Sequence, residues 1–473
     1  MRTSLIRPIL TAVLPAFLQG FSPGLKAQNN SLRFFGNGVN DIDRVKIRLD
    51  APARPVDVSG SFTLEFFMKA NAADNNGYIE NRFDGDGWIT GNIILDRDIY
   101  GSGDYGDFGI SIGSYTGGGS GDRGICFGID RAGNGRSLVA QHNVADGEWH
   151  HIAVTRDSAS GLVRIFIDGV QRTSAAGPAG NVSYRNNRAT TWLQSDPFLV
   201  LGAEKHDAGS AYPSYNGRLD ELRISRTVRY TSDFVPPLSE FTADAFTAGL
   251  YHFNEGTGDT LRDFSNAAGG PSHGVIRRGG TPQGPAWDSD NPFPLALSLK
   301  AIPEGFYRTA SDMLSMRDTV TVYLRNSNWP YQKADSSIGV IDSVGFHSVM
   351  LFMNAQGGSY YADVRHRNSL ETWTSAPIAF TAGVTSAVDL TAFAGSAYGG
   401  NLTQSGTRYC IYSGDVNRDG VVDGSDVLLA DNAAFVYASG YVPEDLSGDF
   451  SVDATDIAIA YNNAASFVSR IIP

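Results

Sequence analysis

The sequence predicts a mostly β protein in which a large β-sandwich is followed by a smaller one and then by a short helical region. Three observations support this prediction. Short runs of alternating apolar and polar residues, separated by Gly, Asn, Asp and Ser clusters, recur from about Ser31 to residue 412. A Gly- and Pro-rich stretch at 267–292 divides these runs into two groups. An acidic pattern then occurs twice in residues 414–473.

Residues 1–27 have the features of a secretory signal peptide. Arg2 and Arg7 precede an apolar stretch at 8–21, which is too short to cross a bilayer, and the small residue Ala27 stands before Gln28. No later segment has the apolar length of a transmembrane helix. We therefore expect a secreted or cell-surface, extracellular protein.

The charge and the cysteines exclude two other classes of protein. The net charge of −13 argues against a nucleic-acid partner. Cys126 and Cys410 both lie in apolar, strand-like runs, so two buried thiols are expected and a disulfide-stapled scaffold is not.

The large β-sandwich is predicted at 31–292. Its runs include SFTLEFFMKA, GICFGID and VRIFIDG, and turn residues separate them, as is typical of a sandwich or barrel. Three longer segments (Asp146–Gln171, Asn216–Pro237 and Ala248–Asn266) resemble laminin-G-like domains, which have a concanavalin A-like jelly-roll fold. The resemblance implies that this domain binds a glycan or an extracellular protein.

The same superfamily includes glucanases, so a polysaccharide hydrolase is the alternative. Retaining hydrolysis needs two carboxyl groups about 5 Å apart. The nearest pair in this sequence is Asp220 and Glu221, and adjacent strand residues are expected to face opposite sides. The sequence therefore favours a non-catalytic protein.

Several residues of the first domain are candidates for ion or ligand binding. The resemblance implies that Asp43 and Asp220 could hold one further calcium ion. A sugar would stack on aromatic side chains near polar groups. Residues 77–122 are rich in such aromatics, and the weak ligand-binding candidates are Trp88, Tyr105 and Tyr115, with Tyr78 and Tyr100 nearby. His150 and His151 lie in a strand-like run without catalytic partners and are expected to be structural.

The smaller β-sandwich is predicted at 295–412 and resembles a module found on many secreted bacterial proteins. One stretch of this region combines polar side chains with an aromatic ring: His366, Arg367, Asn368, Glu371 and Trp373. We expect this polar cluster to fix a loop or the interface with the C-terminal region.

The C-terminal region, 414–473, contains two acidic loops. The second loop begins at Asp445, thirty residues after the first at Asp415, and helical apolar spacing follows each. Calcium binds six to eight oxygen ligands, and a 12-residue loop offers them at positions 1, 3, 5, 7, 9 and 12. In the first loop these positions are Asp415, Asn417, Asp419, Val421 (through its carbonyl), Asp423 and Asp426. In the second they are Asp445, Ser447, Asp449, Ser451 (through its carbonyl), Asp453 and Asp456.

Each loop therefore predicts one calcium ion. The last position is Asp and no helix leads directly into either loop, and in both respects the region resembles dockerin type I-like domains. Position 6 is Gly420 in the first loop but Phe450 in the second, where Gly is usual. The resemblance implies a cohesin-like partner, and the alternative is that the tail braces the 295–412 sandwich. A purely structural surface or matrix protein is a third possibility for the whole chain.

Overall fold

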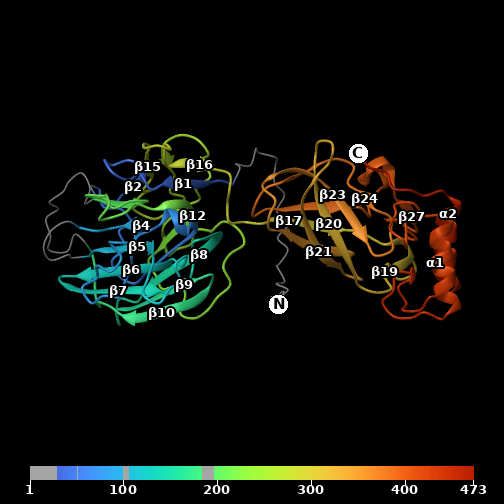
Figure 1. Cartoon of the computed structure of the whole chain (residues 1–473), viewed down its shortest axis with the longest axis horizontal. Coiled ribbons are helices and arrows are strands. Elements are labelled where there is room, and N and C mark those ends of the chain that lie inside the picture. Colours follow the sequence, from blue (N-terminus) through green and yellow to red (C-terminus); the bar gives the residue numbers. More distant parts are fainter. Residues whose placement is uncertain (1–28, 51, 100–105, 184–196) are drawn as a thin grey trace.

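The structure, a computed structural model, describes residues 29–50, 52–99, 106–183 and 197–473. The predicted signal peptide, Tyr100 and Tyr105 lie outside these residues. Two β-sandwiches follow each other along the chain, and the two helices lie at the far side of the second sandwich (Figure 1).

The first sandwich consists of two sheets. One has the strand order β10 (Val170–Ala176), β9 (Leu162–Ile167), β8 (Asp146–Arg156), β3 (Phe62–Asn71), β12 (Asn216–Ser225), β1 (Ser31–Phe35), β16 (Ala286–Asp288), with β13 (Thr247–Tyr251) also paired to β12. The other has the order β14 (Thr260–Leu261), β15 (Gly274–Arg277), β2 (Arg44–Arg48), β11 (Phe198–Leu201), β4 (Asn92–Asp96), β5 (Phe108–Gly113), β6 (Gly124–Arg131), β7 (Asn134–Ala140). A 3-10 turn, η1 (Ala72–Asp74), follows β3.

Strand β3 explains how the first sandwich is connected to the second. Phe62, Leu64 and Phe66 alternate into the core between the two sheets. Phe67 points to the other face, where its ring lies 5.8 Å from that of Phe241 and 5.4 Å from that of Phe293. These rings belong to the same apolar cluster as the core of the second sandwich. The two sandwiches are therefore joined by buried apolar contacts.

The second sandwich has one sheet with the order β22 (His347–Phe352), β17 (Leu295–Lys300), β26 (Thr385–Asp389). Its other sheet has the order β21 (Lys333–Ile341), β20 (Asp318–Asn326), β23 (Gly358–His366), β24 (Thr372–Trp373), with β25 (Ile378–Phe380) paired to β23. The shorter elements are β18 (Tyr307–Arg308) paired with β19 (Met313–Leu314), β27 (Thr403–Ser405) paired with β28 (Arg408–Cys410), and the 3-10 turns η2 (Glu304–Phe306), η3 (Ala394–Ser396) and η4 (Tyr398–Gly400).

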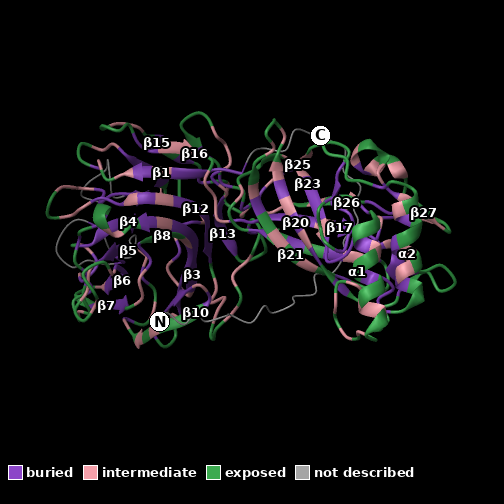
Figure 2. Ribbon diagram, turned by 45° about the vertical axis from the view of Figure 1, so that its right-hand side comes forward, coloured by how far each residue is buried: buried purple, intermediate pink, exposed green. Residues whose placement is uncertain are grey.

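Two helices follow the acidic loops, where apolar spacing predicted them: α1 (Gly424–Phe435) and α2 (Ala454–Ala465). Each begins at a capping box, in which Asp423 and Asp426, or Asp453 and Asp456, satisfy the free amides of the first turn. Each capping box thus uses the last acidic residues of the preceding loop. Much of both helices is exposed to solvent (Figure 2).

Both thiols are free and buried, as the sequence predicted. In the described part of the chain, no helix has the length and apolar character needed to cross a membrane.

Candidate functional site

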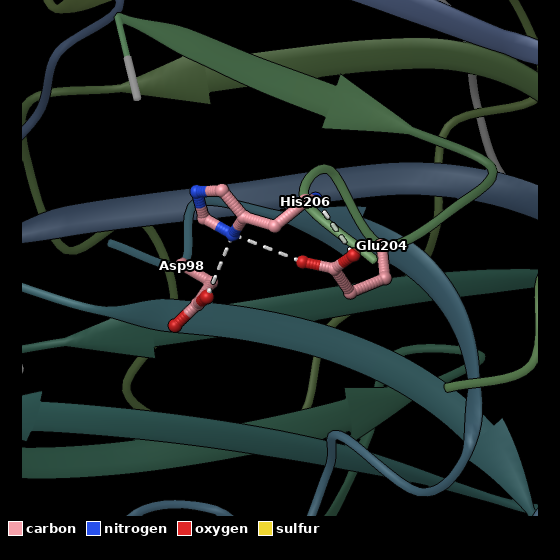
Figure 3. Close-up of side chains that lie close together, drawn as sticks. All are labelled: Asp98, Glu204 and His206. Carbon is pink, nitrogen blue, oxygen red and sulfur yellow. Dashed lines mark hydrogen bonds and ion pairs between the residues drawn. The ribbon is translucent and has the colours of Figure 1, made fainter. Parts of the chain in front are cut away.

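Three polar side chains of the first sandwich converge on one point (Figure 3). Asp98 follows strand β4, and Glu204 and His206 follow strand β11. The Nδ1 atom of His206 lies 3.1 Å from Asp98 Oδ2 and 3.0 Å from Glu204 Oε1. All three candidate ligand atoms lie within 4.8 Å of one another. We refer to these residues as the acid–histidine cluster.

A buried carboxyl group supports the acid–histidine cluster. Asp96 accepts a hydrogen bond of 2.7 Å from the backbone amide of Lys205. Burial, and then the nearby Glu204 carboxylate, raise the pKa of Asp96 to about 7. Burial would raise the pKa of Asp98, but the His206 hydrogen bond, the Lys205 charge and the Asp107 hydrogen bond together outweigh burial, and the pKa of Asp98 is lowered. The cluster can therefore act as an ion-paired group or supply one imidazole and two carboxylates to a divalent metal.

An open pocket with two tyrosines lies elsewhere on the same sandwich. Tyr78 and Tyr115 line a cavity of about 220 Å³ together with Glu80, Asn81 and Gln141. The Tyr78 side chain is 42% exposed. Its hydroxyl lies 2.8 Å from the Thr116 hydroxyl. An exposed aromatic surface beside carboxylate and amide groups has the composition of a sugar-binding pocket. We call this the tyrosine pocket.

Trp88 is not part of this surface. It is 2% exposed and belongs to a small apolar cluster with Ile79, Ile93 and Cys126. A Cβ atom on Gly109 would lie 2.2 Å from its ring, so the tryptophan packs directly against the sheet. The prediction of Trp88 as a ligand-stacking residue is therefore wrong, because a glycine on a neighbouring strand leaves room for it to be buried. Of the predicted candidates, Tyr115 lines the tyrosine pocket, and Tyr105 lies outside the described residues.

Asp43 and Asp220 occupy different places in the first sandwich. Asp43 accepts hydrogen bonds of 2.8 Å from the amides of Phe35 and Asn37, so it closes the turn after β1. Phe35 is paired with Asn216 on β12, four residues before Asp220. The two carboxylates thus lie near different positions of β12 and are not ligands of one shared ion site.

Asp220 is buried in an unusual state. It is 0% exposed, and within the described part of the chain neither carboxylate oxygen has a hydrogen-bond partner. Burial, and then the neighbouring Glu221, raise the pKa of Asp220 well above its usual value. A buried carboxyl group of this kind is either protonated or balanced by a cation. The residue therefore fits a cation, but among the described residues no group of three metal-binding side chains includes Asp220.

The adjacent Glu221 departs from regular strand geometry. It has φ 52° and lies where the pairing of β12 with β3 shifts register, so the predicted alternation of Asp220 and Glu221 across the sheet does not hold there. Its carboxylate accepts a hydrogen bond of 2.8 Å from the Phe241 amide and lies 2.7 Å from His252 Nδ1. Both acids are fully buried, so neither can reach a polymeric substrate.

The first acidic loop brings carboxylates together in a way that fits a calcium ion. Asp415 and Asp426, at positions 1 and 12, are 2% and 0% exposed. Among the described residues, one oxygen of Asp415 has no hydrogen-bond partner. Burial, and then repulsion from Asp426, raise the pKa of Asp415 to about 6. Two buried like charges with a free oxygen are what a hard divalent cation would neutralise.

The second acidic loop turns at the same positions with different residues. Position 6 has φ 89° at Gly420 and φ 67° at Phe450, so Phe450 adopts the left-handed conformation that glycine prefers. Position 4 has φ 62° at Arg418 and φ 69° at Gly448. A Cβ atom on Gly448 would lie 2.6 Å from the Ser315 hydroxyl oxygen. The glycine of the second loop therefore lies where the loop touches the second sandwich.

Several polar contacts fasten the tail to that sandwich. Arg308 Nη2 and the Ser315 hydroxyl both donate to the Ser447 carbonyl, at 2.8 and 2.7 Å. Asn463 Nδ2 donates to Glu304 Oε2 at 2.7 Å.

The predicted polar cluster of the second sandwich takes part in the same interface. Asn368 Nδ2 donates a hydrogen bond of 2.8 Å to the Asp445 carbonyl, and Arg470 Nη1 donates one of 3.1 Å to Glu371 Oε2. The prediction that this cluster fixes the interface with the C-terminal region is confirmed.

The acid–histidine cluster was not predicted from the sequence. Its residues are separated by more than one hundred positions, and pairing of β11 with β4 brings their two segments together. The local signal was an acid two residues after another acid (Asp96, Asp98), and a histidine two residues after a glutamate (Glu204, His206), each following an apolar strand.

The first sandwich contains a segment that matches a known family. Residues 44–233 match the family model of the concanavalin A-like lectin/glucanases superfamily. The first domain is therefore a laminin-G-like jelly roll of concanavalin A type, as the sequence predicted. A comparison with curated proteins gave no match.

The solved structures that match this chain have low similarity to it. A proposed carbohydrate-binding protein from Bacteroides ovatus is 14% identical, with 53% of this chain and 58% of that chain covered and a TM-score of 0.34. The chain thus spans less than two thirds of that protein's length. The IT-sialidase CBM40 of Ruminococcus gnavus bound to α2,3-sialyllactose is 12% identical, with 43% and 93% covered and a TM-score of 0.28. A chain of a type II cohesin–X-dockerin complex from Acetivibrio cellulolyticus is 16% identical, with 36% and 99% covered and a TM-score of 0.24.

Proposed function

We propose that the protein is an extracellular, non-catalytic carbohydrate-binding protein whose jelly-roll domain binds glycan in the tyrosine pocket. The observation that carries this proposal is the pairing of Tyr78 and Tyr115 beside Glu80, Asn81 and Gln141 in one open cavity. The tyrosine rings offer apolar area for a sugar face, and the polar groups can fix the orientation of its hydroxyls.

The same pocket argues against a hydrolase. Glycoside hydrolysis by the common mechanisms needs a pair of carboxyl groups flanking the scissile bond. Of the described residues that line the tyrosine pocket, Glu80 alone carries a carboxyl group. Polysaccharide hydrolysis remains the rival activity, and a purely structural role is the other alternative.

The tail is proposed to bind two calcium ions and to use them for folding. Asp415, Asp426, Asp445 and Asp456 are buried acids at the first and last positions of the two loops. Calcium would neutralise them and connect each loop to the helix that follows it. Millimolar extracellular calcium can fill sites of moderate affinity, which agrees with the proposed signal peptide and export.

A second role for the tail follows from its outer surface. Tyr437 and Phe467 are thirty residues apart at equivalent positions of the repeat, and each is 89% exposed. Two exposed aromatic side chains of this kind favour attachment to a protein partner, for which a cohesin-like domain is the candidate. Bracing of the second sandwich uses other residues, so one tail can serve both roles.

Glycan-array binding of the purified protein tests the main proposal. The native chain is expected to bind at least one glycan, and the Tyr78→Ala/Tyr115→Ala variant is expected to lose that binding by about tenfold or more. Phe246→Ala is the matched control, because this aromatic residue is 55% exposed and does not line the pocket. Absence of binding by the native chain, or release of reducing ends from a polysaccharide, would contradict the proposal.

A further inference from the structure

The second sandwich carries its own exposed aromatic residue. Trp329 lies in the loop between β20 and β21 and is 82% exposed. A tryptophan side chain offers a large apolar area, and leaving most of it in water is unfavourable unless a ligand or partner covers it. Trp329 therefore marks a candidate binding surface.

Trp329 borders a cavity of about 390 Å³. The polar side chains around it are amides, two hydroxyls and a phenol: Asn326, Ser327, Asn328, Gln332, Ser359 and Tyr360. Among the described residues that line the cavity, none carries a charge. Amides and hydroxyls can both donate and accept hydrogen bonds, as sugar hydroxyls do. The lining thus matches an uncharged, hydroxyl-rich ligand and offers no counter-charge to an anion.

The loop that presents the cavity is held by backbone hydrogen bonds. The backbone amide of Asn326 donates a hydrogen bond of 2.9 Å to the Gln332 carbonyl, and that of Tyr331 donates one of 2.8 Å to the Asn328 carbonyl. The other wall is a strand, because Tyr360 of β23 is directly opposite Asn326 of β20. A ligand would therefore meet a pre-arranged surface and lose little affinity to ordering of the protein.

The Tyr360 side chain is held in place by a hydrogen bond and a ring contact. Its hydroxyl donates 2.8 Å to the Gln356 carbonyl, and its ring lies 6.1 Å from that of Phe380 in the core of the sandwich. Tyr360 is thus a rigid side wall, whereas Trp329 is the free stacking surface.

We propose that this cavity is a second carbohydrate-binding site, which binds a neutral oligosaccharide stacked on Trp329. The site belongs to the second sandwich and is separate from the tyrosine pocket, so it does not depend on the function proposed for the jelly roll. The alternative is that Trp329 covers a surface between two copies of the chain.

Affinity electrophoresis in gels that contain a neutral polysaccharide tests the proposal. The probes are galactomannan, xyloglucan, xylan and mixed-linkage glucan, and alginate and polygalacturonate serve as charged probes. The parent protein is the full chain with Tyr78→Ala/Tyr115→Ala, so that the tyrosine pocket does not contribute. We expect at least one neutral probe to retard this parent and the charged probes to leave it unretarded.

Trp329→Ala in this parent is expected to raise the dissociation constant for the retarding probe about tenfold or more. Phe393→Ala is the matched control, because Phe393 is an aromatic of the same sandwich that is 58% exposed and does not line the cavity. It should leave the retardation unchanged. An unchanged thermal unfolding curve for Trp329→Ala excludes loss of folding as the cause, and the exposure of the side chain makes that result expected.

A change of tryptophan fluorescence on titration with the retarding polysaccharide should also disappear in Trp329→Ala. The proposal is overturned if no neutral probe retards the parent, if retardation survives Trp329→Ala, or if ultracentrifugation shows a dimer that depends on Trp329. A negative array result for the tyrosine pocket would leave each of these readouts unaffected, so failures of the two proposals are distinguishable.

Discussion

The guanidinium group of Arg367, on the second sandwich, donates a hydrogen bond of 3.4 Å to the carboxylate of Asp445, the first residue of the second acidic loop. The same arginine donates 2.8 Å to Asp318 on β20 and is largely buried. Asp445 therefore has a cationic neighbour from another domain. In the first loop, the described contacts of Asp415 include the Gly420 amide and no such arginine.

Removing this arginine should make the tail more dependent on calcium. Arg367→Met leaves Asp445 buried without its cationic neighbour, which typically costs about 3 kcal/mol or more, whereas Asp318 keeps His366 and Tyr441 as partners. Calcium can compensate at Asp445, so we expect the melting temperature of the tail to fall more at the lowest calcium concentration that still folds the native tail than in 1 mM calcium. Differential scanning calorimetry at both calcium concentrations measures this difference. Arg308→Met, which removes a hydrogen bond to the Ser447 carbonyl but no contact with a loop carboxylate, is the control.

Chelation alone should unfold the tail while the jelly roll stays folded. The buried acids of the two loops repel one another without a cation, and calcium at one hundred times its dissociation constant would contribute about 2.7 kcal/mol per site. We expect the helical circular dichroism signal to be lost in EGTA and restored by calcium. An identical melting curve in calcium and EGTA would refute a folding role for the metal.

Asp415→Asn provides a finer test of the first loop. It should reduce the number of calcium ions bound, measured by isothermal titration calorimetry, from two to one. Asp431→Asn is the matched control, because this acid is exposed on α1 outside the loop positions. If Asp415→Asn bound calcium like the native chain, Asp415 would not be a ligand.

The sequence predicted the sandwiches, the helices and the interface cluster because each depends on local pattern. Strands such as β3 alternate apolar residues toward the core, and the two acidic loops repeat at a fixed offset. Polar residues grouped in one short stretch, such as Asn368 and Glu371, were also visible without a structure.

Features that depend on pairing between distant strands were not predictable. The acid–histidine cluster needs β11 beside β4, and the exposure of Trp88 was misjudged because Gly109 on β5 makes room for its ring. Asp220 and Glu221 do not alternate across the sheet because a bulge interrupts β12 there, and a single sequence does not reveal a bulge.

The effect on stability of a substitution at position 6 of each loop should depend on backbone strain. In the second loop, Phe450→Gly relieves a left-handed conformation worth about 1–2 kcal/mol, but glycine costs about 0.5–1 kcal/mol in added freedom of the unfolded chain. We therefore expect a small gain in the free energy of unfolding, at most about 1.5 kcal/mol, measured by chemical denaturation. The matched change Gly420→Ala imposes the same strain, and its Cβ atom would lie 2.6 Å from Arg470, so it should destabilise the tail. Equal effects of the two changes would contradict this account.

The stability of the jelly roll should depend on pH through His150. Its ring lies 2.8 Å from Asp168 and 3.0 Å from Asp146. Burial acts to lower the pKa of His150, but the hydrogen bonds and charges of these two carboxylates outweigh it, and the pKa is raised above 6.5. A raised pKa means that the folded state holds the proton more tightly, so the stabilisation is fully present below pH 6.5 and is lost as the pH rises through the folded-state value.

His150→Gln should therefore cost about 1 kcal/mol near pH 6 and progressively less as the pH rises through the folded-state pKa of His150. Urea denaturation of the native and variant chains across pH 5.5–9 measures the difference. His142→Gln is the contrasting variant, because burial, and then Arg172, lower the pKa of His142. A lowered pKa means that protonation of His142 destabilises the folded state as the pH falls. Its replacement should therefore raise the free energy of unfolding at low pH, whereas replacement of His150 should lower it. A His150→Gln effect that is constant across this range would show that the imidazole acts through packing and not through its charge.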